Sequence, residues 1–308
     1  MQNHSHATET VSPGSQRLEP ICPPFSLVLP AYNEEQGIGI TLDHLQDTFR
    51  AAGCEYEIVV VNDGSTDNTG KLLRDRHDIR LIEHVVNRGY GAALKTGIRH
   101  AKYPLIVITD ADGTYPNEQI PRLVSLADEA DMVVGARTGA NVHYSKLRKI
   151  PKWFLVRFAQ WVTGRPIPDL NSGMRVFHKA VVEKFLNILP DTFSFTTTIT
   201  VAMLTNFYVV RYVPIDFHHR VGKSKIKPIQ DTLRFVQLIL RTGVYFAPLK
   251  VFMPIAGVFF TGFLITLFQD VFDRRDLTER TLILFVAATQ VSMFALLADM
   301  IDKRSGGS

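Results

Sequence analysis

Hydrophobic and polar positions follow two alternating patterns along the first half of the chain. Short runs rich in Val, Ile and Leu, which are typical of buried strands, alternate with longer segments whose apolar residues recur every three to four positions, as in helices. The predicted strands cover residues 26–30, 57–63, 79–85, 105–112 and 131–137, and the predicted helices cover 38–52, 69–77, 91–101 and 118–126. This alternation predicts an α/β domain with a mostly parallel sheet that is covered by helices on both faces.

Two long apolar runs lie near the end of the sequence. Residues 251–269 and 281–298 contain no Asp, Glu, Lys or Arg. At about 1.5 Å per helical residue, each run is long enough to cross the roughly 30 Å hydrocarbon core of a bilayer. We therefore predict two C-terminal transmembrane helices that form a hairpin. A pair of helices buried in a soluble core is the alternative, although it is less usual at this length.

Amphipathic segments precede the apolar runs. From residue 146 to residue 163, aromatic side chains such as Trp153 and Trp161 are interspersed with Lys and Arg, which predicts a helix in the membrane interface. A helix packed on the domain core is the alternative, since aromatic stripes at helical spacing are often buried. Residues 231–246 predict a second amphipathic helix that leads into the first membrane span.

These patterns divide the chain into five regions. They are a disordered tail at 1–24, the α/β domain at 25–217, a basic loop with a juxtamembrane helix at 218–248, the transmembrane hairpin at 249–300 and a tail at 301–308. No signal peptide is visible in the polar first 20 residues, so we expect the domain on the cytoplasmic side of the inner membrane. Basic residues between 223 and 250 agree with the positive-inside rule and predict the turn 270–280 on the opposite side.

The composition limits which partners and which cysteine chemistry the protein can have. The 308 residues are 46% hydrophobic and carry a net charge of +4. Because this charge is modest and basic residues gather beside the apolar runs, we expect a membrane partner and no nucleic-acid partner. Cys22 and Cys54 do not have the spacing of metal ligands, so we expect neither a zinc site nor a disulfide, and a reducing cytosol fits.

Polar residues at the ends of the predicted strands are the first candidates for a binding site. In parallel sheets, ligands bind beyond the carboxyl ends of the strands. The segments 30–35 and 62–69 place carboxylates and amides at two such ends, where a base or a ribose could be bound by hydrogen bonds. Residues 66–68 also fit a turn followed by a helix N-cap, and this alternative stays open.

Two further strand ends suit a diphosphate and a metal ion. Gly89 and Gly91 precede a helix that carries Lys95, and a helix N-terminus near a cation suits a diphosphate. Asp110 and Asp112 flank one residue directly after an apolar strand. Two carboxylates at this place can bind Mg²⁺ or Mn²⁺ together with the phosphates of a nucleotide.

Together these motifs resemble those of the family 2 inverting glycosyltransferases. The resemblance spans about residues 25–217 and is closest to the polyprenyl-phosphate branch, which includes dolichyl-phosphate mannose synthase and its bacterial relatives. It implies the Rossmann-like GT-A fold and a metal-dependent sugar transfer. The residues expected to bind the nucleotide sugar are then Pro30, Tyr32, Glu34, Asp63, Lys95, Asp110 and Ala111, and the expected metal ligands are Asp110 and Asp112.

Two more segments resemble the acceptor side of this family. Residues 169–175 are similar to its acceptor motif, and residues 219–225 resemble its basic loop near the diphosphate. The resemblance implies that Arg137, Arg148, Asn171 and Arg175 bind the acceptor phosphate, that Arg220 and Lys225 lie beside the diphosphate, and that Asp112, Arg137 and Asp169 are catalytic. Arginine suits a phosphate because its planar guanidinium pairs with two oxygens and stays charged. We expect Asp169 to orient the sugar or the acceptor.

The expected reaction transfers a sugar from a UDP- or GDP-linked donor to undecaprenyl or dolichyl phosphate. Residues 113–116 depart from the mannose synthase pattern, so the sugar and the base stay open, as does a homo-oligomer. One alternative is a processive polysaccharide synthase, whose Gln-x-x-Arg-Trp motif is matched in part at 157–161. Another is a non-catalytic, membrane-tethered nucleotide-sugar binding module, against which the intact pair Asp110 and Asp112 argues.

Overall fold

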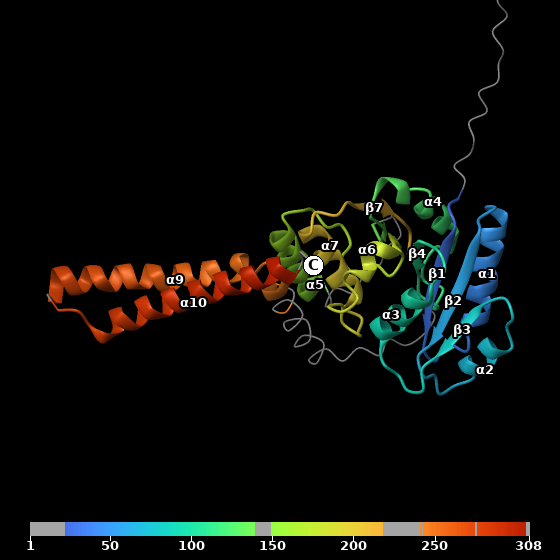
Figure 1. Cartoon of the computed structure of the whole chain (residues 1–308), viewed down its shortest axis with the longest axis horizontal. Helices are drawn as coiled ribbons and strands as arrows, with labels where there is room; N and C mark the ends of the chain where they lie inside the picture. The colour runs from blue at the N-terminus through green and yellow to red at the C-terminus, as the bar shows by residue number, and fades with distance from the viewer. Residues whose placement is uncertain (1–21, 139–148, 218–240, 242, 275, 306–308) are drawn as a thin grey trace, which may run out of the picture.

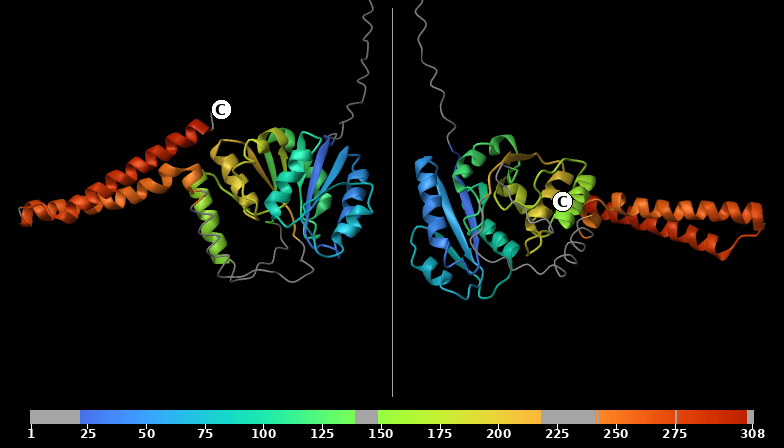
Figure 2. Two further views of the ribbon diagram at one scale, coloured as in Figure 1. Left: turned by 60° about the horizontal axis from the view of Figure 1, so that its bottom comes forward. Right: turned by 180° about the vertical axis from the view of Figure 1, so that it is seen from behind.

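The computed structural model describes residues 22–138, 149–217, 241, 243–274 and 276–305. They form an α/β domain and a long helical hairpin that extends from one side of it (Figure 1). Figure 2 shows that the hairpin leaves the domain beside helix α5 (Lys149–Thr163). Most of the predicted N-terminal tail, the basic loop at 219–225 and about two thirds of the predicted juxtamembrane helix lie outside the described residues.

Within these residues the domain is built on a seven-stranded sheet with the order β3-β2-β1-β4-β6-β5-β7. The strands are β1 (Phe25–Ala31), β2 (Tyr56–Asn62), β3 (Arg80–Glu83), β4 (Leu105–Ile108), β5 (Met132–Ala136), β6 (Arg175–His178) and β7 (Val210–Pro214). Strand β6 runs antiparallel between β4 and β5, and the other neighbouring pairs are parallel. The five predicted strands are confirmed. The sequence analysis missed the two short strands β6 and β7.

Helices cover both faces of the sheet, as predicted. The helices of the domain besides α5 are α1 (Ile38–Ala51), α2 (Thr69–Arg74), α3 (Tyr90–His100), α4 (Ile120–Val124), α6 (Lys179–Glu183) and α7 (Phe195–Thr205), with 3-10 turns at Asn117–Gln119 and Ala127–Glu129. Successive side chains of a strand point to opposite faces. Leu27 of β1 therefore shares a core cluster with Leu42 of α1, whereas Val28 belongs to the cluster that contains Leu94 of α3. The predicted helix at 118–126 is split between a 3-10 turn and α4.

Helix α5 has one buried face and one exposed aromatic face. Leu155, Ala159 and Val162 are buried in a cluster with Leu170, so the core-packing alternative holds for this face. Trp153 and Phe154 on the other face are 57% and 58% exposed, as an interfacial helix requires. The buried face agrees with the core-packing alternative, while the position of the other face in a membrane interface stays a prediction. Residues 146–148 lie outside the described range.

The two apolar runs form helices α9 (Pro248–Gln269) and α10 (Glu279–Ser305), joined through a π-helical turn at Asp270–Arg274. Of the most apolar window of each span, 11% and 17% is buried, so the alternative of two core helices does not fit. Both helices are long and apolar enough to cross a membrane. The base of the hairpin is tied to α5, because Lys250 Nζ donates a hydrogen bond of 2.7 Å to the carbonyl oxygen of Val162.

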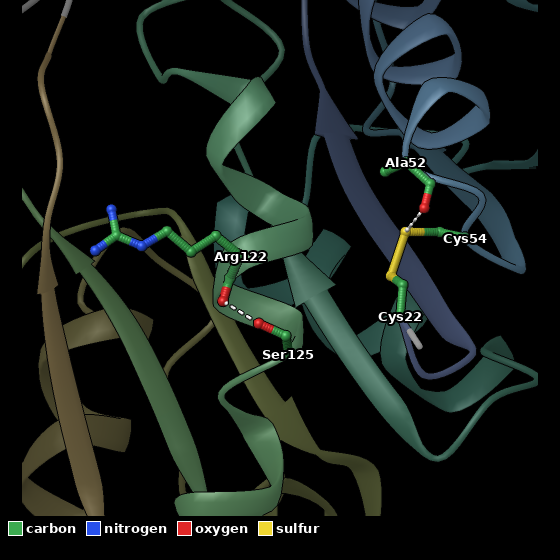
Figure 3. Close-up of a disulfide and its surroundings, with 5 residues drawn as sticks. All are labelled: Cys22, Ala52, Cys54, Arg122 and Ser125. Atoms are coloured by element: carbon green, nitrogen blue, oxygen red, sulfur yellow. Dashed lines mark hydrogen bonds between the residues drawn. A yellow bond between two sulfur atoms is a disulfide. The ribbon is translucent and has the colours of Figure 1, made fainter. Parts of the chain in front are cut away.

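The expectation for the cysteines is wrong: Cys22 and Cys54 form a disulfide (Figure 3). Their Cα atoms lie 5.1 Å apart. The cause is the register of the sheet, in which Phe25 of β1 pairs with Tyr56 of β2. Because parallel neighbours begin side by side, the residues just before the two strands meet, although the crossover through α1 separates them in sequence.

Arg175 links the loop before β6 to helix α7 through hydrogen bonds in the interior of the domain. Its side chain is fully buried and donates hydrogen bonds from Nε to the carbonyl of Ser172 at 2.7 Å, and from its terminal nitrogens to the carbonyl of Leu170 at 2.9 Å and to Thr200 Oγ1 at 2.6 Å. The charge is dispersed over several acceptors, which makes the burial of a guanidinium tolerable.

The disulfide predicts that thermal stability depends on redox state. Closing a loop of 32 residues is worth about 3–4 kcal/mol on the loop-entropy estimate. We expect the unfolding temperature of the oxidised protein to fall by several degrees when reductant is added. The double variant Cys22→Ser/Cys54→Ser should not respond to reductant, and equal temperatures for oxidised and reduced wild type would contradict the bond.

Because of these hydrogen bonds, we predict that Arg175→Met greatly lowers the free energy of unfolding. This substitution removes three hydrogen bonds and leaves two carbonyl oxygens and a hydroxyl buried without their donor, which should lower the free energy of unfolding by about 3–5 kcal/mol. The matched control is Arg122→Met at an exposed site on α4, for which denaturant unfolding should change by less than about 0.5 kcal/mol. Equal effects of the two variants would exclude this role.

Candidate active site

The loops after β1 and β2 are bound to each other by hydrogen bonds. Thr69 Oγ1 accepts from the Glu34 amide at 2.8 Å, and Asn33 Oδ1 accepts from the Thr66 amide at 2.8 Å. Residues 66–68 thus belong to a turn that supports the neighbouring loop, which favours the turn alternative over a direct binding role. At the tip of β1, Tyr32 is 40% exposed, and Pro30 and Glu34 are half-buried beside it.

Asp63 follows β2 and is 3% exposed. Its carboxylate accepts hydrogen bonds from the amides of Arg88 and Gly89, at 2.9 and 2.8 Å, and from His84 Nδ1 at 2.6 Å. Gly64 has a φ of +69°, and a Cβ here would lie 2.5 Å from the carbonyl carbon of Val86. The loop between β3 and α3 is therefore in direct contact with the end of β2. The sequence analysis did not identify His84 as a residue of this site.

The two carboxylates after β4 are both half-buried. Asp110 Oδ1 accepts a hydrogen bond of 3.0 Å from the Tyr90 hydroxyl, and Asp112 Oδ1 accepts one of 2.6 Å from Thr114 Oγ1. The carbonyl oxygen of Ala111 between them accepts from Thr41 Oγ1 of α1 at 3.0 Å. Ala111 therefore contributes its backbone, which fixes this loop to the domain core, while the carboxylates lie on either side.

The acceptor motif lies against the first of these carboxylates. A Cβ on Gly173 would lie 2.8 Å from Asp110 Oδ2, so only a glycine allows this approach. The Gly173 amide donates a hydrogen bond of 2.6 Å to the Tyr115 hydroxyl. The segments 110–115 and 169–173, which are far apart in sequence, thus form one surface at the end of β4.

Arg137 and Asp169 form a buried, bidentate ion pair. Arg137 Nε lies 2.7 Å from Asp169 Oδ2 and a terminal nitrogen lies 2.9 Å from Oδ1, while the amides of Arg137 and Asn171 also donate to this carboxylate at 3.1 Å each. The guanidinium also lies over the Phe217 ring, 5.2 Å from its centroid. Asn171 Oδ1 accepts from Thr197 Oγ1 of α7 at 2.8 Å. Three of the predicted acceptor-side residues therefore come together.

Two tyrosines in this site were missed by the sequence analysis. Burial and the neighbouring Asp110 carboxylate raise the pKa of the Tyr90 hydroxyl and that of Tyr115 well above the usual value. Both hydroxyls therefore keep their protons over the physiological range and donate to, or lie close to, a carboxylate. The signal in the sequence was their position, next to the glycine segment and next to the Asp110–Asp112 motif.

Other predicted residues are placed differently or lie outside the described ranges. Lys95 forms an ion pair of 2.8 Å with Asp191, and both residues line a hollow between α3 and the segment 186–191. Arg175 requires a correction, because its fully buried guanidinium binds protein acceptors and does not face a space that a lipid phosphate could enter. Arg148, Arg220 and Lys225 lie outside the described residues.

The donor set after β4 suits a hard divalent cation. Among the described residues there is no group of three His, Cys, Asp or Glu side chains that could hold a metal ion alone. Mg²⁺ and Mn²⁺ are commonly held by one or two carboxylates together with substrate phosphates. Asp110 and Asp112 meet this requirement, since their oxygens stand at a strand end where a nucleotide diphosphate could complete the coordination.

Known proteins match both parts of the chain. The model of glycosyl transferase family 2 matches residues 26–186, and the model of the GtrB C-terminal hairpin matches residues 247–303. Solved structures of glucosyl-3-phosphoglycerate synthase from Mycobacterium tuberculosis have a similar fold. The complex with phosphoglyceric acid is 18% identical with a TM-score of 0.57, and the complex with Mn²⁺, UDP-glucose and phosphoglyceric acid is 16% identical with a TM-score of 0.56. Both alignments cover 71% of this chain and 80% of the other.

The extent of the family match and the observed sheet agree. The matched segment runs from β1 to the residues that follow α6, which includes the ends of β1, β2 and β4 and the acceptor motif at 169–175. It covers just over half of the 308 residues. The GT-A-like fold that the sequence predicted is therefore confirmed, and the chain belongs to glycosyl transferase family 2, with a C-terminal hairpin of the GtrB type.

Proposed function

We propose that this enzyme transfers a sugar, with inversion, from a nucleoside diphosphate donor to the phosphate of a polyprenyl lipid, such as undecaprenyl or dolichyl phosphate. One observation carries the proposal: an unbroken path of contacts leads from the hairpin to the candidate metal ligands. Lys250 binds Val162 of α5, Val162 packs in one cluster with Leu170, and the loop that follows brings Gly173 against Asp110. These buried contacts hold the hairpin beside the acceptor motif, so a lipid phosphate anchored in the membrane would lie near the candidate metal ligands.

The donor is assigned to the strand ends on the other side of Asp110. Pro30, Tyr32, Glu34 and Asp63 bind the nucleoside, and Lys95, Asp110 and Ala111, with Arg220 and Lys225 of the basic loop, lie on the diphosphate side. This assignment is supported by the fold likeness to an enzyme whose solved complexes contain UDP-glucose and Mn²⁺. Asp110 and Asp112 would hold Mg²⁺ or Mn²⁺, and the ion would neutralise charge that develops on the departing diphosphate.

The acceptor needs no strong general base. A phosphate monoester has a second pKa of about 6, so it is largely a dianion at neutral pH and already a nucleophile. Arg137, Arg148 and Asn171 orient this dianion for an in-line displacement, which inverts the anomeric centre. Asp169 accepts four hydrogen bonds from Arg137 and Asn171, which supports an orienting role for it.

The cytoplasmic location of the domain is part of this proposal, and it is supported by the basic residues between 223 and 250, which agree with the positive-inside rule. The domain lies on the cytoplasmic side, where nucleotide sugars are made, and the turn between α9 and α10 lies on the opposite side. The exposed aromatic residues of α5 lie in the membrane interface, next to the base of the hairpin.

The function predicts formation of a lipid-linked sugar that depends on Asp112. Purified protein in detergent, given UDP- or GDP-linked sugars, Mn²⁺ and a short polyprenyl phosphate, should form a polyprenyl-phosphate sugar that mass spectrometry detects. Asp112→Ala should reduce turnover at least a thousandfold, about 4 kcal/mol, because a metal ligand is lost. The fold should persist, since Asp112 is half-buried in the loop after β4 and its carboxylate accepts hydrogen bonds from the neighbouring Thr114. Near-normal turnover by this variant would remove the metal assignment.

Arg148 should affect the acceptor and not the donor. Loss of a charge-assisted contact to phosphate costs about 1.5–3 kcal/mol, so Arg148→Ala should lower kcat/KM for the lipid phosphate roughly ten- to hundredfold. The dissociation constant of the nucleotide sugar should hardly change. Arg122→Ala on the exposed side of α4 is the control and should change neither quantity. If Arg148→Ala weakened donor binding as strongly as acceptor use, this residue would belong to the donor side.

A further inference from the structure

The environment of Asp63 limits what its carboxylate can still bind. A carboxylate offers about four positions at which it can accept a hydrogen bond, two on each oxygen. Oδ1 accepts from the Arg88 amide at 2.9 Å and from His84 Nδ1 at 2.6 Å, and Oδ2 accepts from the Gly89 amide at 2.8 Å. Among the donors that the described residues supply, two fill the positions on Oδ1 and one binds Oδ2, which leaves one position on Oδ2.

His84 is held in one tautomer by a second contact. Because the ionised carboxylate of Asp63 can only accept, the His84 Nδ1 atom at 2.6 Å must carry a proton. The other ring nitrogen, Nε2, lies 3.0 Å from Thr96 Oγ1, whose hydroxyl can donate to it. His84 and Asp63 have side chains that are 6% and 4% exposed, so water does not compete for these positions. Thr96, His84 and Asp63 thus form a chain of hydrogen bonds from α3 to the end of β2.

The geometry also keeps the carboxylate from turning. The amides of Arg88 and Gly89 are adjacent in the chain and bind one oxygen each, while His84 binds from the end of β3. The Asp63 amide in turn donates to the carbonyl of Ala31 at 2.9 Å, which fixes the backbone to β1. The Asp63 carboxylate is therefore fixed in orientation before a ligand binds at this strand end. It offers the ligand one position at which to donate a hydrogen bond.

We propose that His84 is a positioning residue that makes the nucleoside site selective for an imide base such as uracil over guanine. This inference rests on the proposed function, which places the nucleoside beside Asp63. Uracil presents a single N–H donor on its pairing edge, which one accepting position satisfies. Guanine presents two adjacent N–H donors, of which one would be left without an acceptor in a desolvated site. A buried donor without a partner is costly, so a site of this kind discriminates strongly.

The test compares UDP with GDP on the full chain in detergent, by calorimetry, in the presence of Mn²⁺ and without a lipid acceptor. Wild type should bind UDP at least tenfold more tightly than GDP. His84→Leu removes one of the two donors to Oδ1 and so opens a second accepting position for the other N–H of guanine, and the preference for UDP should fall about tenfold. His84→Asn can place an amide N–H where Nδ1 stood, and it should restore most of the preference.

The ratio of the two dissociation constants separates positioning from general support of the fold. A purely structural role would weaken both nucleotides equally in His84→Leu and leave the ratio unchanged, which would overturn the proposal. Equal binding of UDP and GDP by wild type, or no binding of either, would also overturn it. A protein that prefers UDP but forms no polyprenyl-phosphate sugar would instead refute the proposed acceptor and leave this inference in place.

Discussion

The antiparallel course of β6 is the constraint on which the rest of the site depends. Because β6 runs against β4, with Arg175 opposite Ile108, the segment that enters β6 meets the segment that leaves β4. The acceptor motif at 169–173 is brought in this way to Asp110, and the approach is so close that Gly173 has no room for a side chain. A parallel strand at this place would have carried the same residues to the opposite edge of the sheet.

Several charged side chains near the ends of β2, β4 and β5 are fixed in orientation by their hydrogen-bond partners. Arg137 and Asp169 bind each other through two hydrogen bonds, Arg175 binds two carbonyls and a hydroxyl, and Asp63 is surrounded by three donors. In a buried setting such groups are costly unless each is paired, and once paired they are fixed in orientation. The interior charges therefore set the shape of the loops, on which the donor and acceptor sides are built.

The hairpin is coupled to the domain through α5. This helix packs on Leu170 with one face, receives the hydrogen bond from Lys250 at its C-terminal end, and exposes Trp153 and Phe154 on the other face. Aromatic side chains with a polar neighbour favour the boundary between water and lipid. The same helix thus connects the C-terminal hairpin with the segment that leads into β6.

Sequence alone determined the elements that depend on near neighbours in the chain. The alternation of strands and helices, the two apolar runs and the carboxylate pair at 110 and 112 each follow from a pattern within one element and its adjoining loop, and they predicted the sheet, the hairpin and the family. Tertiary structure decided which distant groups meet. Cys22 bonds to Cys54, Arg175 points inward, Arg137 pairs with Asp169, and His84 binds Asp63, because the order and direction of the strands bring these segments together. A local pattern contains no information on strand order, since that order is set by how whole faces of the sheet and helices bury one another.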